Sequence, residues 1–185
     1  MVSDDRAGVG FTLGRPVPDD INGVLACRAT PAPDGAAAPG LLPGEEDHIR
    51  AMVDSWIGDW HDRGIGYWVL RGRAHAGSGS RPILGEGGVR YSPTPVGEVF
   101  NLYYRLDFRV RGRGWARLLA RLAVIAAHAH DPDTVVIARM APDNHASHRT
   151  ALAAGLRPVG RDASGRLALA DRPIDGRLTW ALAAL

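Results

Sequence analysis

The sequence predicts an α/β domain with a mixed β-sheet covered by helices, and three observations support this class. Short runs rich in β-branched and aromatic residues alternate with longer runs of helical periodicity. Strand Glu98–Leu106, helix Gly114–His130 and strand Thr134–Met140 form a βαβ unit, so we expect parallel strands and a right-handed crossover. The length, 185 residues, suits one domain with a full core. We therefore expect a flexible tail at residues 1–9 and one domain at residues 10–185.

The N-terminal half predicts a strand, two helices and two further strands. Acidic residues suit the start of both helices, and Gly64 suits the end of the second. The second helix has apolar residues at helical spacing, namely Ile49, Met52, Val53, Trp56, Ile57 and Trp60. The predicted elements are a strand at Gly10–Gly14, a helix from Asp19 or Asp20, a loop at Thr30–Gly44, a helix at Glu45–Gly64, a strand at Ile65–Gly72, a hairpin loop at Arg73–Ser80 and a strand at Pro82–Tyr91.

The C-terminal half predicts alternating strands and helices after a turn at Ser92–Gly97. A short helix follows strand Thr134–Met140, with Asp143 or Asn144 as its N-cap and Gly155 at its end. The longer helix before that strand has an apolar face formed by Leu118, Leu119, Leu122 and Ile125. The last strand candidates are Leu156–Arg161, Arg166–Ala170 and Arg177–Leu185.

The composition excludes several classes of protein. A net charge of +2 argues against a general nucleic-acid binder. The sequence has no apolar run of membrane-spanning length, and its N-terminus lacks the basic and apolar regions of a signal peptide. Cys27 is the single cysteine, so no internal disulfide can form and we expect a cytoplasmic protein. Arginine replaces lysine throughout, which indicates a GC-rich bacterial genome.

A basic, glycine-containing turn joins strand Glu98–Leu106 to the helix that follows. A helix start leaves backbone N–H groups without intrahelical partners, and the helix dipole adds partial positive charge there. Glycine lets the backbone approach a phosphate without a Cβ in the way. The turn therefore predicts an anion cradle. Its residues are Arg111, Gly112, Arg113, Gly114, Trp115 and Ala116.

Two common phosphate-binding motifs do not fit this turn. The Walker pattern ends in Gly-Lys-Ser/Thr, and the sequence contains no lysine. The dinucleotide fingerprint needs a glycine where Arg117 stands and an acidic residue on the next strand, which has none. An RNA-binding Arg-Gly segment is also disfavoured, because this one occurs once, beside an apolar helix, in a chain of low net charge.

The turn does fit the pattern Arg/Gln-x-x-Gly-x-Gly/Ala, and on this ground the chain resembles the GNAT family, the GCN5-related N-acetyltransferases. Asn144 and Ser147, followed by Gly155, are similar to the Asn-x-x-Ser and Gly-Phe/Leu residues of the branch that includes ribosomal-protein N-terminal acetyltransferases. The resemblance covers about Glu98 to Arg157. One departure is that Leu106 and Phe108 stand where the family often has Val-x-Pro.

The resemblance implies a GNAT fold with acetyl-CoA as the co-substrate. The sheet would be mixed and mostly antiparallel, of six to seven strands, with helices on both faces and a splayed cleft between strands four and five. Backbone amides of the turn Arg111–Ala116 would hold the pyrophosphate. Backbone groups near Tyr104 and Leu106 would pair with the pantetheine arm, and Asn144 would reach that arm.

The resemblance also implies direct attack of an amine on the thioester, assisted by a general base and a general acid. Glu98 is the predicted base, acting through a water, and Glu86 is a weaker rival. Ser147 is the predicted acid that reprotonates the CoA thiolate; alternatively, its hydroxyl satisfies the first helical turn. His145 and His148 lack cysteine or acidic partners at ligand spacing, so we expect no metal.

We therefore expect an N-acetyltransferase that acts on a primary amine of a small molecule or of a protein N-terminus, in a ternary complex. Two alternatives stay open: a non-catalytic acyl-CoA-binding or regulatory module of the same fold, and a nucleotide- or RNA-binding domain. We expect neither nucleic acid nor a membrane as a partner. The apolar C-terminal residues suit either a buried last strand or pairing across a homodimer.

Overall fold

The computed structural model describes residues 10–29, 44–73 and 81–183. Contacts between Cα atoms divide the chain into two compact units. Unit 1 runs to Glu86 and takes in Arg105–Arg113, and unit 2 consists of Gly87–Tyr104 and the chain from Gly114 onward. The tail at residues 1–9, and nearly all of the predicted loops Thr30–Gly44 and Arg73–Ser80, lie outside the described residues.

The described strands form a mixed sheet. They are β1 (Phe11–Gly14), β2 (Tyr67–Gly72), β3 (Ile83–Thr94), β4 (Gly97–Leu106), β5 (Val136–Met140), β6 (Arg157–Arg161) and β7 (Leu167–Ala170). These seven strands are ordered β1-β2-β3-β4-β5-β7-β6. The pair β4–β5 is parallel, whereas β1–β2, β5–β7 and β6–β7 are antiparallel. The predicted mixed, mostly antiparallel sheet of six to seven strands is therefore confirmed.

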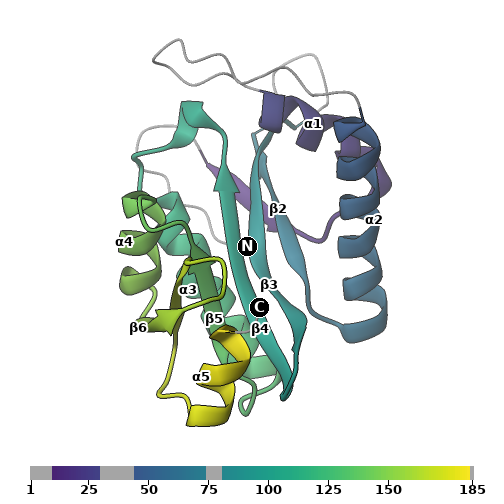
Figure 1. Cartoon of the computed structure of the whole chain (residues 1–185). Coiled ribbons are helices and arrows are strands. Elements are labelled where there is room, and N and C mark those ends of the chain that lie inside the picture. Colours follow the sequence, from purple (N-terminus) through teal and green to yellow (C-terminus); the bar gives the residue numbers. More distant parts are fainter. Residues whose placement is uncertain (1–9, 30–43, 74–80, 184–185) are drawn as a thin grey trace. The chain divides into compact units, whose positions relative to one another are not determined.

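Unit 1 contains the N-terminal helices. They are η1 (Pro18–Asp20), α1 (Ile21–Ala29), α2 (Glu45–Arg63) and, later in the chain, η2 (Phe108–Val110). Three apolar residues of α2 are buried at helical spacing: Ile49, Val53 and Trp56. Gly64 follows α2 with φ +70°, the left-handed conformation that suits glycine at a helix end, as predicted. Figure 1 shows α2 as the longest helix of this unit.

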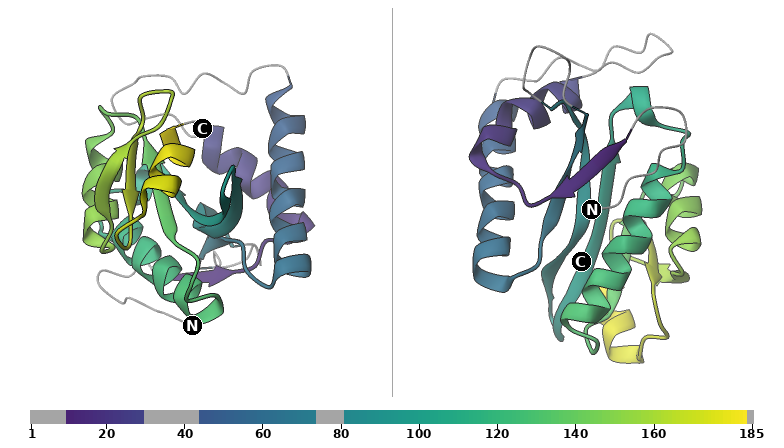
Figure 2. Two further views of the ribbon diagram at one scale, coloured as in Figure 1. Left: turned by 60° about the horizontal axis from the view of Figure 1, so that its bottom comes forward. Right: turned by 180° about the vertical axis from the view of Figure 1, so that it is seen from behind.

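Unit 2 packs helices on its strands. The helices are α3 (Trp115–His130), α4 (His145–Ala153) and α5 (Gly176–Ala183). Val99, Ile137 and Ala170, from β4, β5 and β7, form a buried cluster with Leu182 of α5. Figures 1 and 2 show α3 on the opposite face of these strands from α5. Within unit 2, helices thus cover both faces, as predicted.

The predicted last strand at Arg177–Leu185 is wrong, because α5 occupies Gly176–Ala183. Asp175 explains the helix start: its Oδ1 accepts from the backbone N of Leu178 at 2.8 Å, as an N-cap does. Leu178, Ala181 and Leu182 then turn toward the core at helical spacing. Alanine and leucine favour helix, so the propensity of this apolar run supports the helix that the structure shows and not a strand. The suggestion of a dimer formed through that strand loses its basis.

The predicted apolar face of α3 is also partly wrong. Ile125 is 64% exposed, whereas Leu119 is fully buried. The inward face is instead formed largely by small residues, and its members are Trp115, Leu119, Ala120, Ala123, Val124 and Ala127. The alanines on this face let the helix pack closely on its neighbours. A periodicity search that counts only large apolar side chains does not detect such a face.

The turn predicted at Ser92–Gly97 is shorter in the structure. Strand β3 continues to Thr94, so only Pro95 and Val96 remain between β3 and β4. The hydroxyl of Thr94 donates to the carbonyl of Gly97 at 2.8 Å and closes the hairpin. Proline lacks the N–H that a strand residue usually donates, so Pro93 favoured a turn in the sequence analysis. An exposed strand position tolerates it.

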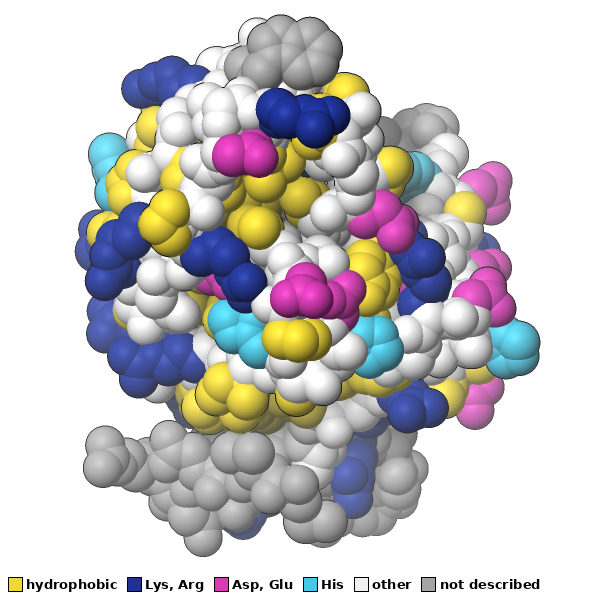
Figure 3. Space-filling view, turned by 90° about the horizontal axis from the view of Figure 1, so that it is seen from below, with side chains coloured by type: hydrophobic (Ala, Val, Ile, Leu, Met, Phe, Trp, Pro, Cys, Tyr) yellow, Lys and Arg dark blue, Asp and Glu magenta, His cyan; other side chains and the backbone are white. Residues whose placement is uncertain are grey.

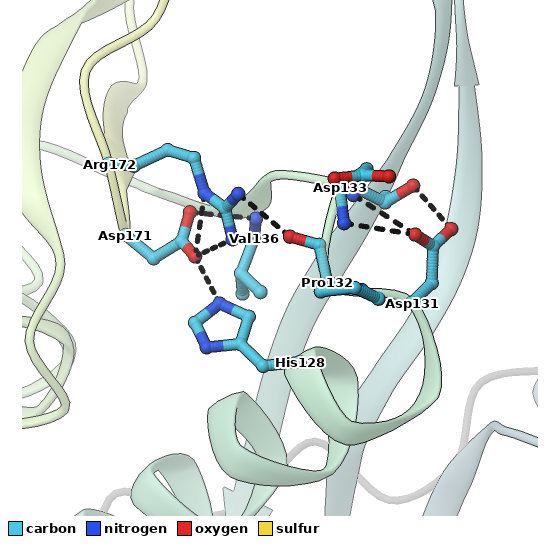
Figure 4. A network of polar contacts seen from close by, with 8 residues as sticks. His128, Asp131, Pro132, Asp133, Val136, Asp171 and Arg172 are labelled. Atoms are coloured by element: carbon cyan, nitrogen blue, oxygen red, sulfur yellow. Dashed lines mark hydrogen bonds and ion pairs between the residues drawn. The ribbon is translucent and has the colours of Figure 1, made fainter.

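A polar network ties the ends of three elements of unit 2 together (Figure 4). The Oδ2 of Asp171 lies 2.5 Å from Nε2 of His128, in the last turn of α3, and 3.3 Å from Arg172. Its Oδ1 accepts from the backbone N of Val136 at 3.0 Å, where β5 begins. Arg172 also donates to the carbonyl of Pro132 at 2.8 Å. One nearly buried carboxylate therefore connects α3, β5 and the end of β7.

We expect the change Asp171→Ala to lower the free energy of unfolding by about 2–3 kcal/mol, because the hydrogen bonds it removes involve charged groups. Urea unfolding at neutral pH measures the effect. Asp133→Ala is the matched control, since that neighbouring aspartate is exposed, and we expect a change within about 0.5 kcal/mol. Equal effects of the two changes would contradict a stabilising role for the network.

Charge is mixed on the face seen in Figure 3, where arginine, acidic and histidine side chains are interspersed with apolar ones. On this face, side chains of both signs lie side by side and form no single-sign field. No helix among the described residues is both long and apolar enough to span a membrane.

Candidate functional site

The basic turn leads into α3 with two glycines in the left-handed conformation. Gly112 has φ +77° and Gly114 has φ +81°. An added Cβ on either would meet no heavy atom within 4 Å, so both glycines border open space. Gly114 is the N-cap of α3, and its carbonyl accepts from the backbone N of Leu118 at 3.1 Å. An open, exposed turn at the start of a long helix lets an anion approach the backbone N–H groups there.

Asp107 fixes the chain just before this turn, within unit 1. Its buried carboxylate accepts from the backbone N and from Nε of Arg109, both at 2.9 Å, and its backbone N donates to the carbonyl of Leu84 at 3.0 Å. These bonds begin the short helix η2. Asp107 thereby restrains the backbone beside Phe108, which stands at the position where the resemblance implies a proline.

Arg111 is held by its own segment. Its Nε donates to the carbonyl of Leu106 at 3.0 Å, and its guanidinium lies over the ring of Phe108, 3.5 Å from the centroid. Partial burial, and next the charge of Arg105, lower the pKa of Arg111 from its ordinary value. The structure therefore holds one positive charge of the turn in place before any ligand arrives. Phe108 serves here as a platform for that cation.

Strands β4 and β5 separate soon after they pair. Within unit 2 their parallel register consists of Phe100 with Val136 and Asn101 with Ile137. Among the described residues of that unit, β4 has no further partner on β5 up to Tyr104. This separation is the splayed arrangement that the sequence predicted. The backbone of an unpaired strand edge can pair with an extended ligand, as expected for pantetheine near Tyr104.

Asn144 and Ser147 lie together at the start of α4. Oδ1 of Asn144 accepts from the backbone N of Ser147 at 3.0 Å, so Asn144 is the N-cap. Asn144 therefore satisfies one backbone N–H of the first helical turn, and both interpretations of the Ser147 hydroxyl stay predictions. The hydroxyl of Tyr104 donates to the carbonyl of Ser147 at 2.8 Å. This bond joins β4 to α4 beyond the point where β4 leaves β5.

The two candidate bases occupy contrasting positions. Glu98 is exposed, at the start of β4 and before the Phe100–Val136 pair. At about 3.3 Å per residue, it lies roughly 10 Å along the strand from Asn101, where the pairing ends. Glu86 is 0% exposed and its Oε1 lies 2.7 Å from Arg28. The buried ion pair with Arg28 gives Glu86 a structural role.

The sole cysteine lies in the same interior of unit 1. Burial, and next the negative charges of Glu86 and Asp107, raise the pKa of the Cys27 thiol from 9.0 to about 12. The thiol therefore stays protonated at neutral pH and is a poor nucleophile. Acyl transfer through a covalent Cys27 intermediate is accordingly disfavoured, and direct attack by the amine stays a prediction.

The raised pKa of Cys27 predicts a loss of stability at alkaline pH. Because the folded pKa lies above the unfolded value of 9.0, the stabilisation is complete below pH 9 and is lost as the pH rises toward about 12. Urea unfolding of the wild type and of Cys27→Ala between pH 7 and pH 10.5 measures it. We expect the wild type to fall more steeply above pH 9, by up to about 1.4 kcal/mol per pH unit. Parallel curves would contradict the burial of this thiol.

The described residues contain no group of three or more His, Cys, Asp or Glu side chains placed to hold a metal ion. His145 and His148 lie on α4, and neither joins such a group within the described part of the chain. The expectation of a metal-free protein stays a prediction.

The comparisons with known proteins agree with this geometry. The family model "Acetyltransferase (GNAT) domain" matches residues 11–157 and so spans both units. A search of curated proteins found no match. The fold and the family match define an acetyltransferase that uses acetyl-CoA as its co-substrate. The chain belongs to the GNAT family of acetyltransferases.

Solved structures of bacterial acetyltransferases have the same fold. A GNAT-family acetyltransferase from Bordetella pertussis is 20% identical, with a TM-score of 0.68 and coverage of 91% of this chain and 96% of that one. An acetyltransferase from Agrobacterium tumefaciens strain C58 is 20% identical, with a TM-score of 0.64 and coverage of 88% and 91%. A chimera of spermidine N-acetyltransferase SpeG from Vibrio cholerae and hSSAT is 14% identical, with a TM-score of 0.58 and coverage of 86% and 92%.

Sequence reasoning missed three contributions to this region. The Asp107 bonds, the stacking of Arg111 on Phe108 and the Tyr104–Ser147 bond were not foreseen. The close Asp-x-Arg spacing of Asp107 and Arg109 was a usable signal, because such a pair can cap a short turn. The Tyr104–Ser147 bond joins residues 43 positions apart, and no local pattern announces it.

Proposed function

We propose that the protein is an N-acetyltransferase that moves the acetyl group of acetyl-CoA directly to a primary amine in a ternary complex. The observation that carries the proposal is the turn before α3, with Gly112 and Gly114 in left-handed conformations beside open space. Its backbone amides, together with those of Trp115 and Ala116, would bind the pyrophosphate. Arg111 and Arg113 would add charge-assisted bonds to the phosphates.

The pantetheine arm of acetyl-CoA would extend along β4. In this proposal the backbone at Tyr104 and Leu106 pairs with pantetheine, and the amide nitrogen of Asn144 donates to the same arm. The cap on α4 uses only Oδ1 of Asn144, so the proposal leaves that cap in place. The carbonyl of Leu106 already accepts from Arg111, and its second lone pair is compatible with a ligand N–H.

Bound acetyl-CoA supplies an activated thioester. The neutral amine nitrogen attacks the carbonyl carbon, an amide of β4 stabilises the developing oxyanion, and the carbon–sulfur bond breaks. We assign to Glu98 the removal of the ammonium proton through water, since its place on β4 requires a relay. We assign to the Ser147 hydroxyl the transfer of a proton to the departing thiolate, and the second proton that the nitrogen loses as the amide forms replaces it on Ser147.

The acceptor is proposed to be a small-molecule amine or a protein N-terminus. The fold resemblance to the SpeG chimera adds a polyamine to the amines worth testing, although that similarity extends only to the fold. The alternative is a non-catalytic acyl-CoA-binding module. The observation favouring it is the position of Glu98 before the paired part of β4 rather than beside the separated part.

Calorimetric titration of the full chain with acetyl-CoA, and with ATP as the control, tests the donor site. Thiol release from acetyl-CoA, measured with a polyamine, amino acids and an unacetylated peptide, tests transfer. We expect micromolar acetyl-CoA binding, no ATP binding, and thiol release that depends on one of the amines.

The outcomes separate the alternatives. Binding with amine-dependent release supports the enzyme, and binding without release from any class of amine supports the non-catalytic module. A folded protein that does not bind acetyl-CoA would overturn both readings. Loss of release in Glu98→Gln, with acetyl-CoA binding retained, would support the base; unchanged release would remove Glu98 from the mechanism.

A further inference from the structure

The hydroxyl of Tyr104 makes a tertiary contact that helix formation in α4 does not need. It donates to the carbonyl of Ser147 at 2.8 Å. A carbonyl in the first turn of a helix also accepts from the residue four positions on, so this oxygen uses its second lone pair for Tyr104. The bond therefore does not build α4. It fixes where the first turn of α4 lies relative to β4.

The contact lies in the part of unit 2 where β4 is no longer paired with β5. The ladder between β4 and β5 stops at Asn101 and Ile137, and Tyr104 is three residues further along β4. Beyond the ladder, no strand pairing among the described residues sets the spacing between β4 and the segment that follows β5. A hydrogen bond from β4 to α4 supplies a restraint at this position.

The residues that this bond positions, Asn144 and Ser147, are the ones with roles in the proposed reaction. Asn144 caps α4 by accepting from the backbone N of Ser147, so both residues move with the first helical turn. Any shift of that turn against β4 would change the distance from the Ser147 hydroxyl to a thioester lying along β4. Displacements of about 1 Å can cost a large factor in rate when catalysis depends on positioning.

Tyr104 is suited to a constant structural bond and poorly suited to proton transfer. Burial raises the pKa of its hydroxyl from 10.0 to about 12, partly offset by its contacts with Ser147 and Thr150. The phenol therefore keeps its proton throughout the physiological range and remains a donor.

We propose that Tyr104 is a positioning residue, whose hydroxyl sets the place of the first turn of α4, with Asn144 and Ser147, against the separated part of β4. The proposal rests on the proposed acetyl transfer, because its consequence is a rate. Tyr104 touches neither the amine nor the breaking bond in this assignment. Its loss should lower turnover more than it weakens acetyl-CoA binding.

The variant Tyr104→Phe removes one oxygen and keeps the ring. We expect kcat to fall roughly ten-fold while the Kd for acetyl-CoA, measured by calorimetry, changes less than about three-fold. Amide hydrogen exchange in the first turn of α4, His145–Arg149, should become roughly three- to ten-fold faster. The matched control is Tyr91→Phe, which removes a tyrosine bond of similar length, 3.1 Å to Asp131, at the other end of the strands. It should change neither kcat nor exchange in α4.

Unchanged kcat in Tyr104→Phe would overturn the proposal, as would equal losses in both variants, which would indicate general destabilisation. Unchanged exchange in α4 would overturn the restraint itself. If the wild type binds acetyl-CoA but releases no thiol, acetyl transfer fails and the role in the reaction fails with it. Faster amide exchange in α4 of Tyr104→Phe would then still show that Tyr104 restrains α4, even though the proposed function had failed.

Discussion

Gly114→Val should weaken acetyl-CoA binding by roughly 10- to 100-fold. Gly114 has φ +81°, and a β-branched residue in that conformation costs on the order of 1–2 kcal/mol or more. The turn would relieve this strain by leaving the left-handed conformation, which redirects the amides at the start of α3. The new side chain would also enter the open space that the phosphate needs. Calorimetric titration with acetyl-CoA measures the effect.

Gly165→Val is the matched control for this change. Gly165 has φ +80° and also borders open space, but it lies in the turn between β6 and β7. The two substitutions should destabilise the chain by similar amounts in urea unfolding, about 1–2 kcal/mol each. Only the change at Gly114 should weaken acetyl-CoA binding. If both variants bind like the wild type, the pyrophosphate is not held at this turn.

Glu86→Gln should lower the free energy of unfolding by about 3–5 kcal/mol, since removing one partner leaves the other charge uncompensated in the interior. Glu86 is fully buried, and the side chain of its partner Arg28 is only 16% exposed. The pair joins β3 to α1, and Arg28 also contacts the sulfur of Met52 on α2, at 3.5 Å. Urea unfolding at neutral pH measures the loss.

The double variant Arg28→Met/Glu86→Leu is the control for this interpretation. Replacing a buried ion pair with apolar side chains of similar volume often costs little, because both desolvation penalties disappear. We therefore expect the double variant to be clearly more stable than Glu86→Gln alone. Additive losses would indicate that each side chain stabilises unit 1 independently of the other.

The sequence alone was sufficient for those features that depend on neighbouring residues. The periodicity of α2, its end at Gly64 and the Asn144 cap of α4 are local, and the structure has them as predicted. The same holds for the glycine turn before α3 and for the parallel βαβ unit around it. Each follows from backbone preferences within a few residues, or from the constraint that short crossovers impose.

Local patterns failed where a residue's partner is distant. The C-terminal run Gly176–Ala183 is apolar enough for a strand, and its helical form depends on packing Leu182 against Val99, Ile137 and Ala170. The exposure of Ile125 likewise depends on which face of α3 the sheet accepts. Propensity and periodicity favour a helix or a strand, but which residues become buried depends on the tertiary neighbours that the element packs against.

The sequence by itself determined the family, the glycine turn before α3 and the order of most elements, because these reside in contiguous residues. Only the tertiary structure decided that Glu86 is an ion-paired core residue and that the Tyr104 hydroxyl bonds to the carbonyl of Ser147 in α4. Arg28 and Glu86 are far apart along the chain, as are Tyr104 and Ser147. Such pairs meet only when the sheet has formed, since contacts at long sequence separation are set by the fold and not by local preference.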